Sequence, residues 1–245
     1  MIGDIVTVAW KEWWEFRDQL FKFRRGGLSA LFVILMLGVF TPLQMGTVWL
    51  HSPLMLLYWP LLASGMVSTL IADAFAGERE RHTLESLLAT RLSDSAILIG
   101  KVSAAVLYGL VFTLANILVG YVVLSIKMAR EGLIVPPLGQ LSLVVVLVVL
   151  TCAALAGIGV FISLRAATVR QAQQTLGIIM MILLMGPFLF IQTLGADARV
   201  SVAQRLTDIG TDRIIAWAIL ILGAAAMLLN AMALARFKRG KLVLD

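Results

Sequence analysis

The side chains that most often carry catalysis or bind metals are few in this sequence and lie far apart. There is one cysteine, Cys152, inside an apolar run, and there are two histidines, His51 and His82. Neither a disulfide framework nor a His/Cys metal cluster can be built from these residues within one chain. We therefore expect no metal site and no redox chemistry.

Two short patterns resemble catalytic motifs but lack the residues that those motifs require. Gly100-Lys101 resembles the end of a phosphate-binding loop, yet Ser95 replaces its first glycine and Val102 its closing Ser/Thr. Ala63-Ser64-Gly65 faintly resembles an intramembrane serine protease, but no histidine lies within a long apolar stretch to act as base. The chain is therefore expected neither to bind ATP by itself nor to catalyse a reaction, and no catalytic residue is assigned.

The most informative pattern is the polar segment between two apolar stretches, where a short amphipathic helix is predicted over 78–91. Four leucines recur there at helical spacing: Leu84, Leu87, Leu88 and Leu92. Ser93-Asp94-Ser95 then offers side-chain oxygens suited to cap the next helix. The leucine stripe must bury against the lipid surface, the protein's own helices or a partner's groove, and periodicity alone leaves these alternatives open.

Composition indicates an integral membrane protein. The chain of 245 residues is 60% hydrophobic and 14% charged, with a mean hydropathy of +0.97. Crossing a bilayer takes roughly 20 mostly apolar residues in a helix. Six stretches qualify, at about 28–50, 54–76, 102–126, 138–164, 172–194 and 214–235. We predict an all-α membrane protein with six transmembrane helices in a single domain over 1–245.

Positive charge predicts the orientation. The two terminal segments and the loops on their side of the membrane carry fifteen of the 20 Lys and Arg residues, and the opposite loops carry five. Loops rich in Lys and Arg stay in the cytoplasm, so both termini are expected there. The net charge of +6 is explained by basic loops facing anionic lipid, and no nucleic-acid partner is expected.

The N-terminal segment 1–27 combines an interrupted aromatic stripe with charges of both signs. Such a helix is too polar to span and is expected to lie in the headgroup plane as an interfacial elbow helix. The residues expected at the membrane interface are Trp10, Trp13, Trp14, Arg17 and Phe21. The helix would serve either as a passive anchor or as a lever, and its sequence does not separate the two. No signal peptide is recognised.

Polar side chains within the predicted spans are candidates for a substrate path or for hydrogen bonds between helices. They include Gln44, Ser64, Ser68, Thr69, Asn116 and Asn230. Asp73 is the only acidic residue in the six spans, and we expect it to pair with Arg79 or Arg165. A passive channel would need a polar stripe along one helix, and none of the spans has one.

Two segments carry a resemblance to a known family. The segment from Gly77 to Thr90 (GERERHTLESLLAT), which leads into Ile99-Gly-Lys101, resembles the motif after the second span of ABC-2 type transporter permeases. The segment from Ser163 to Gln174 (SLRAATVRQAQQ) is similar to the sequence leading into the fifth span in the sodium-extrusion-like branch of that family. Two positions depart from the family pattern: His82 stands where glycine is common, and Arg91 stands where proline is usual.

The resemblance implies that the cytosolic helix is a coupling helix seated in a cleft of an ATP-hydrolysing subunit. Its implied docking residues are Glu78, Glu80, Thr83, Leu84, Glu85, Leu87 and Leu88. ATP and Mg would be bound by that partner, and this chain would hold no cofactor. The implied partners are two cytosolic ATPase subunits, a second permease copy or a homologous permease, and membrane lipid.

The function expected from this resemblance is that of a permease subunit, most often an exporter, in a prokaryotic plasma (inner) membrane. The alternative is a non-transporting relay that passes ATPase motion to an external or periplasmic partner. The 18-residue outer loop 195–212 would then be the contact surface.

Overall fold

The structure is a computed structural model that describes residues 2–21, 28–46, 49, 54–83, 89–128, 137–195, 197–201, 208 and 210–237. Every regular element in these ranges is helical, which confirms the all-α fold class. The elements are α1 (Ile2–Phe21), α2 (Leu28–Val33), the π-helix η2 (Ile34–Phe40), α3 (Thr41–Met45), α5 (Leu54–Glu80), α7 (Asp94–Lys127), α8 (Leu138–Arg165), α9 (Val169–Thr193) and α11 (Thr211–Arg236).

Five of these helices, α5, α7, α8, α9 and α11, are long and apolar enough to cross a membrane. Four of them begin and end within about one turn of the predicted spans, whereas α7 begins at Asp94, well before the span predicted from Val102. The early start is explained by the predicted cap, because Ser93 Oγ accepts a hydrogen bond from the Ala96 N–H at 3.2 Å.

The first predicted span, 28–50, differs from a uniform transmembrane helix. Its helical segments α2, η2 and α3 follow one another without a break, but the apolar stretch Leu31–Met45 is shorter than the other five helices. Pro42 lacks an N–H, and the preceding turn is wider than an α-helix, with the Thr41 N–H donating to Met36 O. Helical structure ends before Gly46, whose φ of 58° favours glycine.

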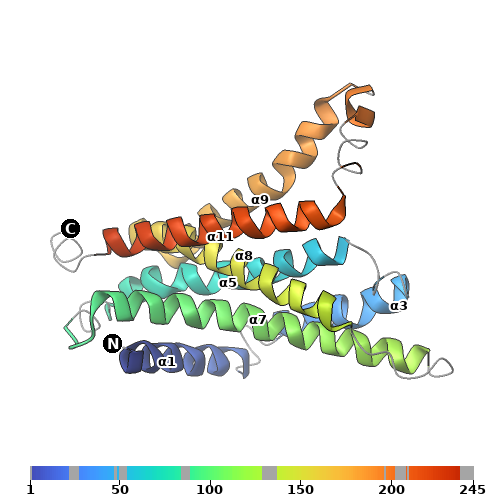
Figure 1. Cartoon of the computed structure of the whole chain (residues 1–245). Coiled ribbons are helices and arrows are strands. Elements are labelled where there is room, and N and C mark those ends of the chain that lie inside the picture. The colour runs from blue at the N-terminus through green and yellow to red at the C-terminus, as the bar shows by residue number, and fades with distance from the viewer. Residues whose placement is uncertain are drawn as a thin grey trace.

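The centre of the bundle is the contact between α5 and α8, on which α7 and α11 also pack (Figure 1). The chain runs back and forth along the bundle, so α1 begins and α11 ends at the same end (Figure 1). α9 begins beside α5 and α8 and then diverges from the other helices toward its C-terminal end (Figure 1). Most of its side chains after Leu176 are exposed as a result.

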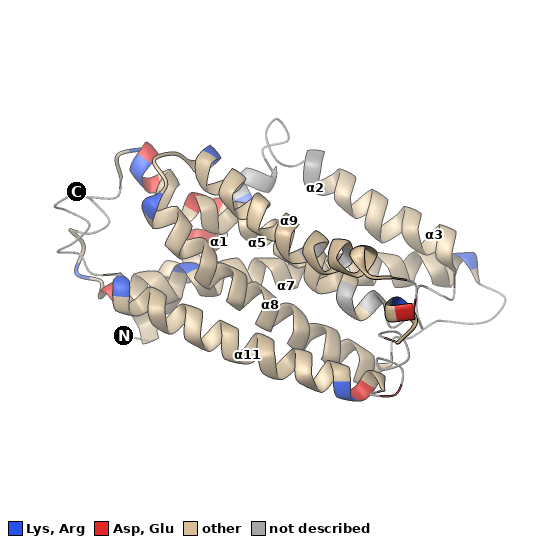
Figure 2. Ribbon diagram, turned by 90° about the horizontal axis from the view of Figure 1, so that it is seen from above, with Lys and Arg blue, Asp and Glu red and all other residues tan. Residues whose placement is uncertain are grey.

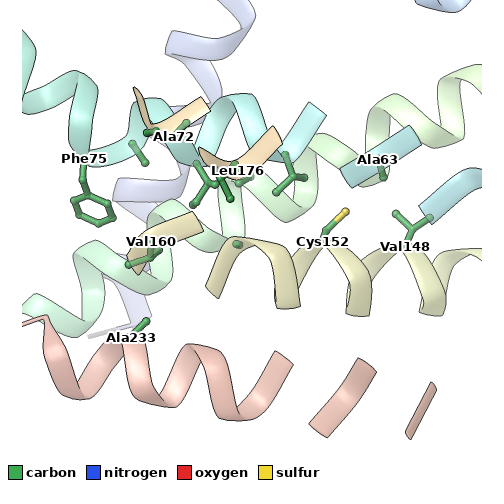
Figure 3. Close-up of a cluster of buried hydrophobic side chains, with 14 of the residues drawn as sticks. Ala63, Ala72, Phe75, Val148, Cys152, Val160, Leu176 and Ala233 are labelled. Carbon is green, nitrogen blue, oxygen red and sulfur yellow. The ribbon is translucent and has the colours of Figure 1, made fainter. Parts of the chain in front are cut away.

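Small residues let α5 and α8 approach closely. Gly159 faces Ile71 so tightly that a Cβ atom at position 159 would lie 2.1 Å from the Ile71 Cγ2 atom. Figure 3 shows side chains of this core, among them Ala63 of α5 and Cys152 of α8. Shape-matched apolar packing of this kind fixes the relative position of two helices, because any slide would create both voids and clashes.

Charged residues gather at the two ends of the bundle and leave its middle without charge (Figure 2). The end where α1 begins and α11 ends carries most of them (Figure 2). This arrangement suits a protein whose helices cross a bilayer, because apolar side chains face the acyl chains and charges remain at the headgroups.

Candidate functional site

The C-terminal turn of α5 carries the largest concentration of long-range polar contacts among the described residues. α5 continues beyond the predicted span end at Ala76 and finishes at Glu80, so the charged run Glu78-Arg79-Glu80-Arg81 follows directly from a core helix. Successive residues of a helix point about 100° apart. The charged residues of this run therefore reach different neighbours.

Glu78 belongs to a group of four charges, three of which are buried. Lys101 Nζ donates to Glu12 Oε1 at 2.7 Å and lies 3.3 Å from Glu78 Oε1. Lys11 Nζ lies 3.6 Å from the same Glu78 oxygen. Lys101, Glu12 and Glu78 are only 3%, 4% and 7% exposed. We call Lys11, Glu12, Glu78 and Lys101 the charge cluster; it joins α1, α5 and α7.

The charge cluster is electrically balanced, as burial of charge requires. Thr83 Oγ1 donates to the second carboxylate oxygen of Glu78, so both oxygens of that side chain have partners. Partial burial lowers the pKa of Lys11, but the carboxylates of Glu78, Glu15 and Glu12 outweigh it and hold the pKa above its ordinary value. Lys11 therefore remains charged at neutral pH.

Arg79 and Ser163 fasten the same end of α5 to α8. The Arg79 guanidinium donates to Ala166 O and Leu164 O, both at 2.7 Å, and satisfies carbonyls at the C-terminal end of α8. Ser163 Oγ accepts hydrogen bonds from two successive N–H groups of α5 at 3.1 and 3.0 Å. It also donates to Ala72 O at 2.9 Å. These bonds fix the final turns of α5 against α8.

Glu80 and Arg81 complete the set of contacts. Glu80 Oε2 accepts a hydrogen bond at 3.1 Å from the Val169 N–H, at the N-terminus of α9, where a carboxylate is favourable. Arg81 contacts both Asp73 oxygens, at 3.0 and 2.9 Å. This hydrogen bonding to Asp73 raises the pKa of Arg81 above its ordinary value, against a smaller effect of burial. The prediction that Asp73 pairs with Arg79 or Arg165 is wrong, because Arg81 folds back over the last turns of α5.

The helix α1 lies alongside the first half of α7 (Figure 1). Gly100 permits this, because a Cβ atom there would lie 2.6 Å from Val8 Cβ. Further along, the rings of Trp13 and Phe16 pack against Tyr108 with centroids 6.4 and 6.0 Å apart. The buried face of α1 is therefore Val8, Glu12 and Phe16.

The predicted membrane-interface residues occupy two sides of α1. Trp10 and Trp14 are exposed, and the Arg17 guanidinium lies 3.5 Å from the centroid of the Trp14 ring. Trp13 instead packs on α7. The side chain of Phe21 lies outside the described residues.

The structure places the expected docking residues in three settings. Glu78 and Glu80 belong to α5, and their carboxylates are engaged by other helices of this chain. Thr83 follows a turn and bonds to Glu78. The remaining members, Leu84, Glu85, Leu87 and Leu88, lie outside the described residues.

The bounds of the predicted 78–91 helix need correction at both ends. Residues 78–80 are the last turn of α5, and residues 89–92 form turns and bends rather than helix. The physical reason is that α5 continues uninterrupted past its apolar stretch, while Ser93 starts α7 immediately after the loop. Between them, His82 adopts a φ of 57°.

We expect His82→Gly to stabilise the protein by about 1 kcal/mol, because a residue with a Cβ atom is strained at positive φ and glycine is not. His82 is exposed and loses little packing on substitution. Chemical denaturation in detergent measures the change, with His82→Asn expected to lie near wild type and His82→Val below it. Equal stability of the glycine and valine variants would contradict the left-handed turn.

The polar residues predicted within the spans mostly bond to their own helix. Ser64, Ser68 and Thr69 donate to carbonyls three residues earlier, and Asn116 Nδ2 donates to Phe112 O. Asn230 of α11 also donates to Ala153 O of α8 at 2.8 Å and so joins two helices. Gln44 is exposed at the end of α3.

Sequence reasoning missed Glu12, Lys101 and the role of Ser163. Glu12 has a recognisable signal, because it lies one turn from both Val8 and Phe16 and so interrupts an apolar stripe. Lys101 is an isolated cation in the first turns of an otherwise apolar helix, next to Gly100. Both signals indicate a buried ion pair, although the partner of neither residue can be identified from the sequence.

No grouping of three or more His, Cys, Asp or Glu side chains suited to a metal occurs in the described ranges. The described site is thus a junction of helices held by ion pairs and hydrogen bonds.

Comparison with known families agrees with the helical membrane architecture. The family described as ABC-2 type transporter matches residues 5–195, which include most of α1 and all of α5, α7, α8 and α9. The chain therefore belongs to the ABC-2 type transporter family, as a multi-pass membrane permease component and not as the ATPase. Membership in this family implies partnership with ABC ATPase subunits. No curated protein sequence matches the chain.

Proposed function

We propose that this chain is the permease subunit of an ABC exporter and that it converts motion of its ATPase partners into movement of substrate across a membrane. The observation that carries the proposal is the junction at the end of α5. This short stretch is bound to α1 by the Lys11–Glu78 ion pair and to α7, α8 and α9 by hydrogen bonds, so displacement of the loop after α5 is passed to helices on both sides.

The proposed docking surface for the ATPase is the segment 78–90, with Glu78, Glu80, Thr83, Leu84, Glu85, Leu87 and Leu88 as its members. The contacts described above assign two different roles to these residues. Glu78 and Glu80 hold the segment against this chain, because both carboxylates already have partners in it. The four members from Leu84 to Leu88 then supply the surface that the ATPase contacts.

The proposed assembly has two ATPase subunits and two permeases, the second being another copy or a homologous chain. Six spans are proposed, with Leu31–Met45 as the core of the first. Both termini would lie in the cytoplasm of a prokaryotic cell, since α1 begins and α11 ends at the end of the bundle with most charges (Figure 2). The chain is proposed to belong to the sodium-extrusion-like branch of the family, because the segment 163–174 resembles the sequence that leads into the fifth span in that branch.

In the proposed cycle, ATP closes the ATPase pair and the docked segment moves with it. Closure of this kind is a rigid-body step that reorients helices and exposes the path alternately to the two sides. α5 and α8 are expected to move as a unit, because Ser163 and Arg79 join them.

The experiment is to purify the complex, reconstitute it in vesicles and compare Leu87→Asp with wild type. Leu87→Asp puts a charge into an apolar docking surface, so we expect loss of ATPase co-purification and of ATP-dependent flux. The matched control is Ala167→Asp, at an exposed position in the link between α8 and α9, at the same end of the bundle but outside the proposed docking segment, which should leave the ATPase bound. Retention of the ATPase by Leu87→Asp would contradict the docking assignment.

The alternative is a relay that transports nothing and passes motion to an external partner. It would use the outer loop between α9 and α11, where Arg199 donates to Leu194 O at 2.9 Å. ATP-dependent flux of any compound in vesicles that contain only the purified complex excludes a pure relay.

A further inference from the structure

We infer that α1 is a lever and not a passive lipid anchor: through the Glu12–Lys101–Glu78 ion pairs, it is a positioning element that moves with the ATPase-docking segment. This inference rests on the proposed function and adds to it a role for a helix outside the membrane spans.

The first step is the nature of the contact between α1 and the rest of the protein. A lipid anchor needs only an outward apolar face, and α1 has one in Val6 and Trp10. Its inner face, however, carries the buried carboxylate of Glu12, which bonds to Lys101 at 2.7 Å. A lipid anchor does not require a charge on its inner face. Burying such a charge costs free energy unless the charge is paired.

The second step is that an ion pair adds a directional restraint to apolar packing. Apolar contacts resist sliding through the fit of their shapes but have no preferred direction. A buried Lys–Glu contact keeps its energy only at hydrogen-bond distance, because displacement leaves two unpaired charges in a poorly solvated site. α1 is thus held in register with α7 at Glu12 and, one turn earlier, at the close contact of Val8 with Gly100.

The third step is continuity with the docking segment. Lys101 Nζ is shared between Glu12 and Glu78, and Glu78 also receives the Thr83 hydroxyl at the start of the loop. The path from the loop to α1 therefore passes through three bonded contacts, of which the two made by Lys101 are buried. Lys11 adds a second, half-exposed contact from α1 to Glu78.

The fourth step is that the same end of α5 is bound separately to α8 and α9. Arg79 and Glu80 make those contacts, on other sides of the helix. A displacement of the docking segment is therefore divided between an α8–α9 branch and an α1–α7 branch. In the second branch α1 is engaged through the buried carboxylate of Glu12 and, at the half-exposed edge, through Lys11.

The test uses the reconstituted complex of this chain with its ATPase, in a Cys152→Ala background. One spin label at Val6→Cys reports on α1, and a second, in a separate sample, at Ala89→Cys reports on the docking segment. Accessibility of each label to oxygen and to a water-soluble nickel chelate is compared without nucleotide and with ATP trapped by vanadate. We expect both labels to shift in the wild-type complex.

Glu12→Gln is the deciding variant, because it removes the buried charge that α1 contributes and leaves Lys101 paired with Glu78. The Val6 label should lose its nucleotide-dependent shift, and the Ala89 label should keep its own. Glu15→Gln is the matched control, the same change on the same helix at a half-exposed site, and it should preserve both shifts.

Three outcomes overturn the inference. A shift at Ala89 with none at Val6 in wild type makes α1 an anchor and leaves the proposed function standing. If the label at Val6 keeps its nucleotide-dependent shift in the Glu12→Gln variant, the ion pair does not couple α1 to the docking segment. No shift at either site, or no bound ATPase, overturns the proposed function and the lever together.

Discussion

Lys101→Met is expected to destabilise the protein by about 3–5 kcal/mol, the largest effect of any single substitution considered for this chain. The methionine fills a similar volume but leaves Glu12 and Glu78 buried without the cation that both contact. Denaturant titration of the purified protein in detergent, followed by intrinsic tryptophan fluorescence, measures the loss.

Two further variants separate loss of charge from loss of packing. Lys11→Met is the matched control, because Lys11 belongs to the same charge cluster but its side chain is 51% exposed, and it should cost less than about 1 kcal/mol. The triple variant with Glu12→Gln and Glu78→Gln added to Lys101→Met should recover part of the loss, since no unpaired charge remains. A triple variant no more stable than Lys101→Met would contradict the electrostatic explanation.

Gly159→Ala is expected to destabilise the protein by about 1–3 kcal/mol, although alanine is the better helix former. The added methyl group would lie 2.1 Å from Ile71 Cγ2, so either α5 or α8 must shift within a closely packed interface. The same denaturant titration measures this change. Because Ser163 and Arg79 hold the adjacent turns, the shift should extend to the docking segment.

The control for this substitution is Gly65→Ala, in α5, where a Cβ atom meets nothing within 4 Å. That variant should be neutral or more stable by up to about 1 kcal/mol, from helix propensity alone. Gly159→Ala combined with Ile71→Ala should be less destabilised than the sum of the two single changes, because the new methyl occupies space that the isoleucine vacates. Additive losses would show that the two residues are not in contact.

Lys101 and Gly159 both affect how the docking segment is attached to the helices that surround it. In an apolar bundle most contacts are non-directional, whereas the end of α5 is held by charged and hydrogen-bonding groups with definite geometry. Such contacts suit a junction that must pass on small movements. They also explain why a segment rich in Glu and Arg follows directly from a transmembrane helix.

The amino-acid sequence by itself determined the membrane class, the helical fold and the bounds of most long helices. Long apolar stretches in a bilayer can satisfy their backbone groups only as helices or closed barrels, and these stretches lack the alternation of a barrel strand. The helix cap at Ser93 could likewise be predicted from the sequence, because it depends on residues that are neighbours in the chain. The π-helical turn in the first span was not predicted, although Pro42 gave a local signal for it.

Only the tertiary structure decided which charges meet. Glu12, Glu78 and Lys101 are far apart in the chain, and no local pattern distinguishes Lys101 as the cation that pairs with both carboxylates. Asp73 pairs with Arg81, and not with Arg79 or Arg165, which were expected at the same end of the spans, because the direction of the chain after α5 sets its partner. Helix formation depends on residues within a turn of one another, whereas an ion pair depends on how whole helices pack, and that packing is set by the entire core.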